Sequence, residues 1–168
     1  MGKVVAAAAA KHLTPVLLEL GGKNPAIVDS SANLRVTAQR LAWGRFLNGG
    51  QTCTAPDYVL VEESSAGRLV EELKQVVAEW YGEGRTDLSR IISAAHFQRL
   101  RAYLQHPGTA ERVVAGGQME EARLFMAPTL LRDVPWDAPV LQEEVFGPIL
   151  TIQSVRSLPP CKLEGGGG

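Results

Sequence analysis

Short apolar stretches that suit strands alternate along this chain with longer stretches that suit helices. Apolar residues recur from Leu34 to Phe46 at the spacing of one helix face, and the same pattern extends from Leu69 to Trp80. Such alternation predicts an α/β fold in which crossover helices cover a mostly parallel sheet. The expected strands lie at 16–20, 25–29, 57–63, 90–93, 112–117 and 127–131, and the expected helices at 2–13, 33–46 and 94–104, with another that Ser64 or Ser65 caps.

The first strand-like stretch, "VLLEL" at 16–20, follows Pro15 and stops at two glycines. Its apolar composition predicts a buried strand. Because glycine has no side chain, the backbone at Gly21 and Gly22 can approach a ligand closely. A binding site is therefore expected where this strand ends.

The charge balance gives no support for a polyanionic partner. The 168 residues carry 17 Lys and Arg against 18 Asp and Glu, a formal net charge of −1. Neither nucleic acid nor an anionic membrane surface is therefore expected as a partner. The apolar run 4–10 is too short to span a bilayer, and no other membrane segment is visible. The three histidines share no ligand-like spacing, so we expect no metal site.

Two cysteines, Cys53 and Cys161, lie in dissimilar contexts far apart in the sequence. Such a pair does not predict a disulfide framework. It predicts a reducing, cytoplasmic location. Cys161 falls in the stretch 158–168, "LPPCKLEGGGG", whose prolines and glycines predict a disordered tail.

Cys53 closes the sequence "GGQTC" at 49–53 and has two interpretations from the residues alone. Free cysteine is often a small buried hydrophobe. A thiol that follows a glycine turn can instead act as a nucleophile, because a fraction is ionised near neutral pH and a carbonyl can reach it.

The charged candidates also have alternative interpretations. Glu19, between two leucines, is either the polar position of an edge strand or a general base whose pKa apolar neighbours would raise. Glu143 and Glu144 read as a solvated pair of acids. The basic residues Arg99 and Arg101 read as a solvated helix face.

Three segments together resemble the aldehyde dehydrogenase superfamily. They are "LELGGKNP" at 18–25, "FLNGGQTCTAPD" at 46–57 and "QEEVFGPIL" at 142–150, and Glu19 and Cys53 lie 34 residues apart. Three further segments are similar to sequences of the class 3 branch of that family: "AAAAAKHLTPV", "LAWGRFLN" and "RIISAAHFQRL". The resemblance extends over roughly residues 2–157.

The resemblance implies a role for each candidate. Cys53 would attack the aldehyde to form a thiohemiacetal, and Glu19 would activate the water that hydrolyses the thioester. The Leu20 backbone and Gly21 would lie against the nicotinamide of NAD or NADP. Glu144 would bind the nicotinamide ribose hydroxyls and Phe146 would pack near the ring, whereas Lys23 and Asn24 would be structural.

The resemblance also implies how the chain is organised. Residues 1–13 are expected to be the remnant of a cofactor-domain helix, 14–157 a catalytic domain and 158–168 the tail. The chain is thus expected to be a catalytic-domain fragment, inactive alone for lack of the cofactor-binding half. The alternatives are a non-catalytic pseudoenzyme that associates with a full-length relative, and a cofactor-free thiol esterase; a homodimer is a further expectation.

Overall fold

The computed structural model describes residues 1–82 and 88–156, so the predicted disordered tail lies outside the described residues. Its centre is a five-stranded sheet in the order β1-β2-β7-β6-β3. The first three adjacent pairs are parallel, and β3 pairs antiparallel to β6. The predicted mostly parallel sheet is therefore confirmed. The strands are β1 (Pro25–Val28), β2 (Tyr58–Glu62), β7 (Ile149–Val155), β6 (Thr129–Arg132) and β3 (Val113–Ala115).

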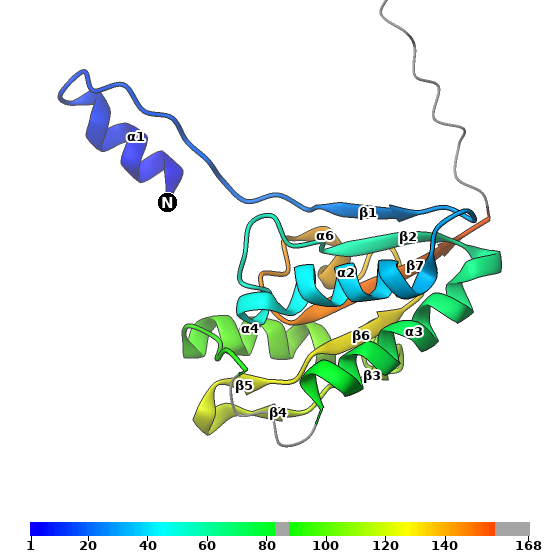
Figure 1. Ribbon diagram of the computed structural model, residues 1–168. Coiled ribbons are helices and arrows are strands. Elements are labelled where there is room, and N and C mark those ends of the chain that lie inside the picture. The colour runs from blue at the N-terminus through cyan, green and yellow to red at the C-terminus, as the bar shows by residue number, and fades with distance from the viewer. Residues whose placement is uncertain (83–87, 157–168) are drawn as a thin grey trace, which may run out of the picture.

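Helices cover both faces of this sheet (Figure 1). Successive residues of a strand point to opposite faces, and β6 shows the result: Leu130 packs into one apolar core and Leu131 into another. The first core contains α2 (Leu34–Phe46) and α3 (Glu63–Tyr81), and the second α4 (Ala94–Gln105) and α6 (Pro139–Gln142). The shorter elements are η1 (Leu47–Gly50), α5 (Pro107–Ala110), β4 (Met119–Glu120), η2 (Glu121–Arg123) and β5 (Phe125–Met126).

The helices begin in two different ways. The Asn33 side chain accepts a hydrogen bond from the Val36 N–H and caps α2, and Ser93 caps α4 likewise. Helix α3 begins at Glu63 with no side-chain cap, so the predicted cap at Ser64 or Ser65 is wrong. The chain passes directly from the last residue of β2 into α3, which places both serines inside the first turn.

Helix α1 (Gly2–Ala10) stands apart from the sheet at the end of an extended segment (Figure 1). It confirms the helix predicted for 2–13 as far as Ala10. None of its residues is buried. Within residues 1–82 and 88–156, no helix combines the length and the apolar character that crossing a membrane requires.

The buried strand predicted at 16–20 is wrong. These residues have no regular secondary structure and are exposed, with 90% of Leu17 accessible. An apolar stretch forms a strand only if its backbone groups find a neighbouring strand. In the described part of the chain β1 forms that edge of the sheet and pairs only with β2.

The strand predicted at 90–93 is also wrong. Ile91 is buried and its N–H donates to the Leu124 carbonyl, but Ile92 is exposed. The Gln51 side chain, rather than a strand, satisfies the Arg90 carbonyl and the Ile92 N–H. The apolar pair therefore anchors a loop.

Candidate active site

Cys53 follows a tight turn at the end of α2. Asn48, Gly49 and Gly50 all have positive φ, between 53° and 72°, a conformation that glycine adopts without strain. The turn leads the chain outward, and Cys53 is exposed and forms no disulfide. Of the two interpretations of this thiol, the structure therefore contradicts the buried hydrophobe.

Gln51 fixes the position of this turn. Its side-chain Nε2 donates to the Asn48 carbonyl at 3.0 Å and to the Arg90 carbonyl at 3.0 Å. Its Oε1 accepts from the Ile92 N–H at 2.9 Å. The residue two positions before Cys53 thus joins the turn to the loop that precedes α4.

The turn lies against the loop 143–148, which carries Glu144 and Phe146. A Cβ atom on Gly50 would lie 2.2 Å from the Gly147 carbonyl oxygen, so glycine is required for this approach. The Arg45 guanidinium donates a hydrogen bond to the same carbonyl. Two of the three sequence motifs therefore meet through their backbones.

A buried charge network joins the third motif to them. Arg45 Nη1 donates to Asp57 Oδ1 at 2.7 Å, and both side chains are almost completely buried. Lys23 Nζ lies 3.6 Å from Asp57 Oδ2. Burial lowers the pKa of Lys23 from its usual range, while the Asp57 carboxylate opposes that shift. The Asp57 carboxylate also accepts from the Val145 N–H.

Lys23 and Asn24, which were expected to be structural, donate hydrogen bonds to backbone carbonyls of both other motifs. Lys23 donates to the Val140 carbonyl at 2.9 Å and to the Glu143 carbonyl at 2.8 Å. Asn24 Nδ2 donates to the Cys53 carbonyl at 2.7 Å and to the Ala55 carbonyl at 3.1 Å. The segment after Glu19 is therefore held against both the Cys53 turn and the 143–148 loop.

Glu144 and Gly21 are brought into contact. Glu144 is half-buried, and a Cβ atom on Gly21 would lie 2.2 Å from its Oε2, so the absence of a side chain makes room for the carboxylate. Phe146 is also half-buried and has a φ of 48°. Gly21 and Glu144 thus lie against each other, and Phe146 follows Glu144 by two residues on the same loop.

Arg99 corrects one prediction. It was expected on a solvated face, but it is half-buried and donates to the Glu144 carbonyl at 3.2 Å and the Val145 carbonyl at 2.7 Å. Tyr103 on the same helix donates to the Glu143 carboxylate at 3.0 Å. The two acids are therefore part of an ordered loop that α4 supports.

Glu19 and Leu20 lie on the exposed segment that precedes Gly21. The desolvation that the neighbouring leucines of Glu19 were expected to cause is absent, because those leucines are themselves exposed. The described contacts therefore connect the Cys53 turn with the Glu144 loop and Gly21 with Glu144, and they do not include the Glu19 side chain.

Sequence reasoning missed Arg45, Asp57 and Gln51. Arg45 carried a usable signal, because it follows Leu41 by four residues and shares the buried face of α2. Arginine on an apolar helix face requires a buried partner. The identity of that partner is set by the fold.

Comparisons with known proteins agree with this geometry. The model of the family described as "Aldehyde dehydrogenase family" matches residues 1–160. This chain belongs to the aldehyde dehydrogenase family. The match covers all the residues that the structure describes, and it contains the Cys53 turn, the 143–148 loop and the segment around Glu19.

The curated relatives of this aldehyde dehydrogenase chain bear family 3 names. Mouse "Aldehyde dehydrogenase family 3 member A2" is 47% identical over 94% of the chain and 32% of the relative. Rat "Aldehyde dehydrogenase, dimeric NADP-preferring" is 48% identical over 94% of the chain and 35% of the relative. The chain therefore spans about a third of the length of these relatives, and its likeness to the class 3 branch is confirmed.

Solved structures confirm the fold. The structure described as "Substrate bound state of Staphylococcus Aureus AldH" superposes with a TM-score of 0.86 at 42% identity, covering 93% of this chain and 34% of that one. An NAD-dependent aldehyde dehydrogenase from Sinorhizobium meliloti superposes with a TM-score of 0.81 at 32% identity, covering 93% and 32%.

Proposed function

We propose that these residues form the thiol-bearing part of an NAD(P)-dependent aldehyde dehydrogenase, which converts an aldehyde to a carboxylic acid. The observation that carries this proposal is the exposed Cys53 thiol, which follows a left-handed turn and is held between Asn24 and the Glu144 loop. A free thiol of this kind also suits a reducing, cytoplasmic location.

The chemistry of Cys53 follows from its exposure. Its sulfur attacks the aldehyde carbon, a C–S bond forms, and the carbonyl electron pair moves to the oxygen. The Cys53 backbone N–H is the proposed donor to that oxyanion. Once the hydride of the thiohemiacetal has left for bound NAD or NADP, the carbon is held as a thioester. Glu19 would then take a proton from water, whose oxygen attacks the thioester carbon; the C–S bond breaks, and the carboxylic acid leaves as the thiol is restored.

The residues around Glu144 fit the nicotinamide end of NAD or NADP. A half-buried carboxylate is a suitable acceptor for two ribose hydroxyls, and the Phe146 ring and the Leu20–Gly21 backbone would border the nicotinamide. When bound, the cofactor supplies the acceptor for the hydride that leaves the thiohemiacetal carbon.

The rest of the cofactor site lies outside the described contacts. A pyrophosphate is commonly bound where a glycine turn opens a helix. In residues 1–82 and 88–156, the helices follow Met1, Asn33, Glu62, Ser93, His106 and Ala138, and none follows a glycine. We therefore propose that the chain alone forms a thiohemiacetal with an aldehyde, and a thioester with an activated ester, but does not reduce NAD or NADP.

p-Nitrophenyl acetate tests the role of Cys53 without a cofactor. Attack by the thiolate releases p-nitrophenolate and leaves acetyl-Cys53, so the wild-type chain should give an initial burst of one equivalent. Cys53→Ala should lose the burst, whereas the matched variant Cys161→Ala should keep it. A burst of equal size in Cys53→Ala would overturn the proposal.

Glu19→Gln tests the base in the same assay. The burst should remain, because Glu19 is not needed for attack, and the steady release that follows should fall by about a hundredfold or more.

Addition of an aldehyde with NAD or NADP separates the candidate activities. Steady ester turnover without cofactor reduction fits the thiol esterase or this chain unaided, whereas cofactor reduction would show that the chain binds the whole cofactor.

A second candidate role is association with another copy or a longer relative. Residues 1–20 expose several large apolar side chains, including Leu13 at 91% and Leu17 at 90%. Large apolar side chains exposed in one segment are typical of a binding interface. We expect light scattering to give a mass above 18.1 kDa for the wild-type chain, and Leu13→Ser with Leu17→Ser to lower it. A monomeric wild-type chain that also fails to bind a full-length relative would exclude this role.

A further inference from the structure

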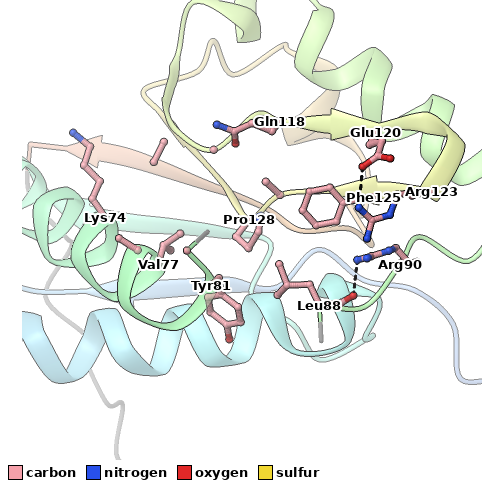
Figure 2. Close-up of a pocket in the computed structure, with 15 residues that line it drawn as sticks. Lys74, Val77, Tyr81, Leu88, Arg90, Gln118, Glu120, Arg123, Phe125 and Pro128 are labelled. Atoms are coloured by element: carbon pink, nitrogen blue, oxygen red, sulfur yellow. Dashed lines mark hydrogen bonds and ion pairs between the residues drawn. The ribbon is translucent and has the colours of Figure 1, made fainter. Parts of the chain in front are cut away.

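A cavity of about 570 Å³ lies away from the Cys53 turn, between α3 and the β4–β5 hairpin (Figure 2). Its volume lies in the range of small-molecule sites, roughly 300–1,000 Å³. None of the proposed catalytic or cofactor-binding residues lines it. The walls are apolar and aromatic, and include Val77, Tyr81, Leu88, Phe125 and Pro128.

The rim of this cavity is predominantly basic. Among the described residues, Lys74, Arg90 and Arg123 line it, against one acid, Glu120. Arg123 pairs with Glu120 at 3.2 Å, and Lys74 pairs with Glu71 at 2.9 Å. These two ion pairs neutralise the charges of Lys74 and Arg123. Arg90 is the remaining cation among these lining residues.

Arg90 is positioned at the end of the cavity beside the aromatic wall. Its Cζ lies 5.0 Å from the centre of the Phe125 ring, and its Nη1 donates to the Leu88 carbonyl at 2.8 Å. Among the described residues, it pairs with no carboxylate. Figure 2 shows Arg90, Arg123 and Phe125 gathered at this end and Lys74 at the other. The guanidinium therefore retains hydrogen-bond donors for an anion that reaches this end.

We propose that this cavity is a binding site for a small aromatic monocarboxylate. The ligand ring would occupy the apolar space between Val77, Pro128 and Phe125, and its carboxylate would accept hydrogen bonds from Arg90. Hydrogen bonds of this type between a guanidinium and a carboxylate are stronger than those between neutral groups. A flat ring suits the aromatic wall better than a branched aliphatic chain does.

The backbone of Arg90 connects this site to the Cys53 turn. Its carbonyl accepts from Gln51, and Gln51 also accepts from the Ile92 N–H. The cation that recognises the ligand thus lies on the loop that fixes the turn. The binding proposal itself does not depend on the activity of Cys53, so it can fail or stand independently of the dehydrogenase proposal.

Titration with 2-naphthoate, observed by saturation-transfer NMR, tests the site. The neutral analogue 2-naphthamide has the same ring without the charge, and should bind about tenfold more weakly or less. Prior alkylation of Cys53 with iodoacetamide should not change the affinity, which separates this cavity from the catalytic turn. Equal affinity for the acid and the amide, or loss of binding on alkylation, would overturn the proposal.

Two variants locate the ligand. Arg90→Gln should weaken naphthoate binding about tenfold and leave the amide unchanged. Ala78→Phe places a ring into the cavity from an exposed position on α3, and should abolish binding of both compounds. The matched variant Arg101→Gln removes a half-buried cation on α4 that pairs with Glu121 and does not line the cavity, and should have no effect. Unchanged naphthoate affinity in Arg90→Gln and Ala78→Phe, or no binding to the wild-type chain, would refute the site.

Discussion

At the scale of single residues, Gly50 is the strictest requirement of the Cys53 turn. Its φ is 72°, and a Cβ atom there would lie 2.2 Å from the Gly147 carbonyl oxygen. We expect Gly50→Ala to lower the free energy of unfolding by about 2 kcal/mol or more, because backbone strain and the clash add. The same variant should lose the acetyl burst, since the turn that presents Cys53 must shift.

Gly67→Ala is the matched control, because Gly67 lies inside α3 and an added Cβ would meet nothing within 4 Å. Alanine is the better helix former by about 1 kcal/mol, so this variant should be slightly more stable and keep its burst. Urea unfolding measures both effects. Similar small changes in the two variants would show that the approach of Gly50 to Gly147 imposes no constraint.

At the scale of elements, the sequence pattern predicted those whose signal is local. Helices α2 and α4 and strands β1, β2, β3 and β6 lie where periodicity or β-branched runs placed them. The central strand β7 was not predicted, because polar Thr151 and Gln153 interrupt its apolar run. Both are buried, and Gln153 exchanges hydrogen bonds with the Val134 backbone. Residues 16–20 show the opposite error, in which an apolar stretch was predicted to be a strand and is not. Apolar residues alone do not provide the neighbouring strand with which such a stretch must pair.

The candidate site shows the same division between what the sequence motifs reveal and what the fold adds. Cys53, Gly21, Glu144 and Phe146 could be named from the motifs, and those assignments stay predictions. The contacts that support them could not be named, because an ion pair between Arg45 and Asp57 depends on how α2 crosses the start of β2. Arg99 was misread for the same reason: its carbonyl partners lie 45 and 46 residues away.

At the scale of the whole molecule, Asp57 connects parts of the chain that are distant in sequence. Its carboxylate contacts Arg45 from α2, Lys23 before β1 and the Val145 N–H beside Glu144. Through Arg45, it also acts on the Gly147 carbonyl and hence on the Gly50 turn. One buried carboxylate therefore aligns all three motifs.

Asp57→Asn should consequently be among the most damaging single changes outside the proposed catalytic residues. It keeps the shape of the side chain but leaves Arg45 as a buried cation without its counter-charge, and breaking a buried pair costs about 3–5 kcal/mol. Stabilities of whole domains are only about 5–15 kcal/mol, so the urea midpoint should fall sharply.

Glu72→Gln provides the comparison, because the Arg35–Glu72 pair at 3.3 Å is partly exposed and should contribute about 1 kcal/mol or less. The acetyl burst is then measured at urea concentrations where both variants are still folded. A difference in burst rate under these conditions reports the alignment of the Cys53 turn and not the stability of the fold. Asp57→Asn should react more slowly at Cys53 than Glu72→Gln, since the turn and the loop lose their common anchor. Equal midpoints and equal burst rates in the two variants would show that the buried carboxylate does not align the site.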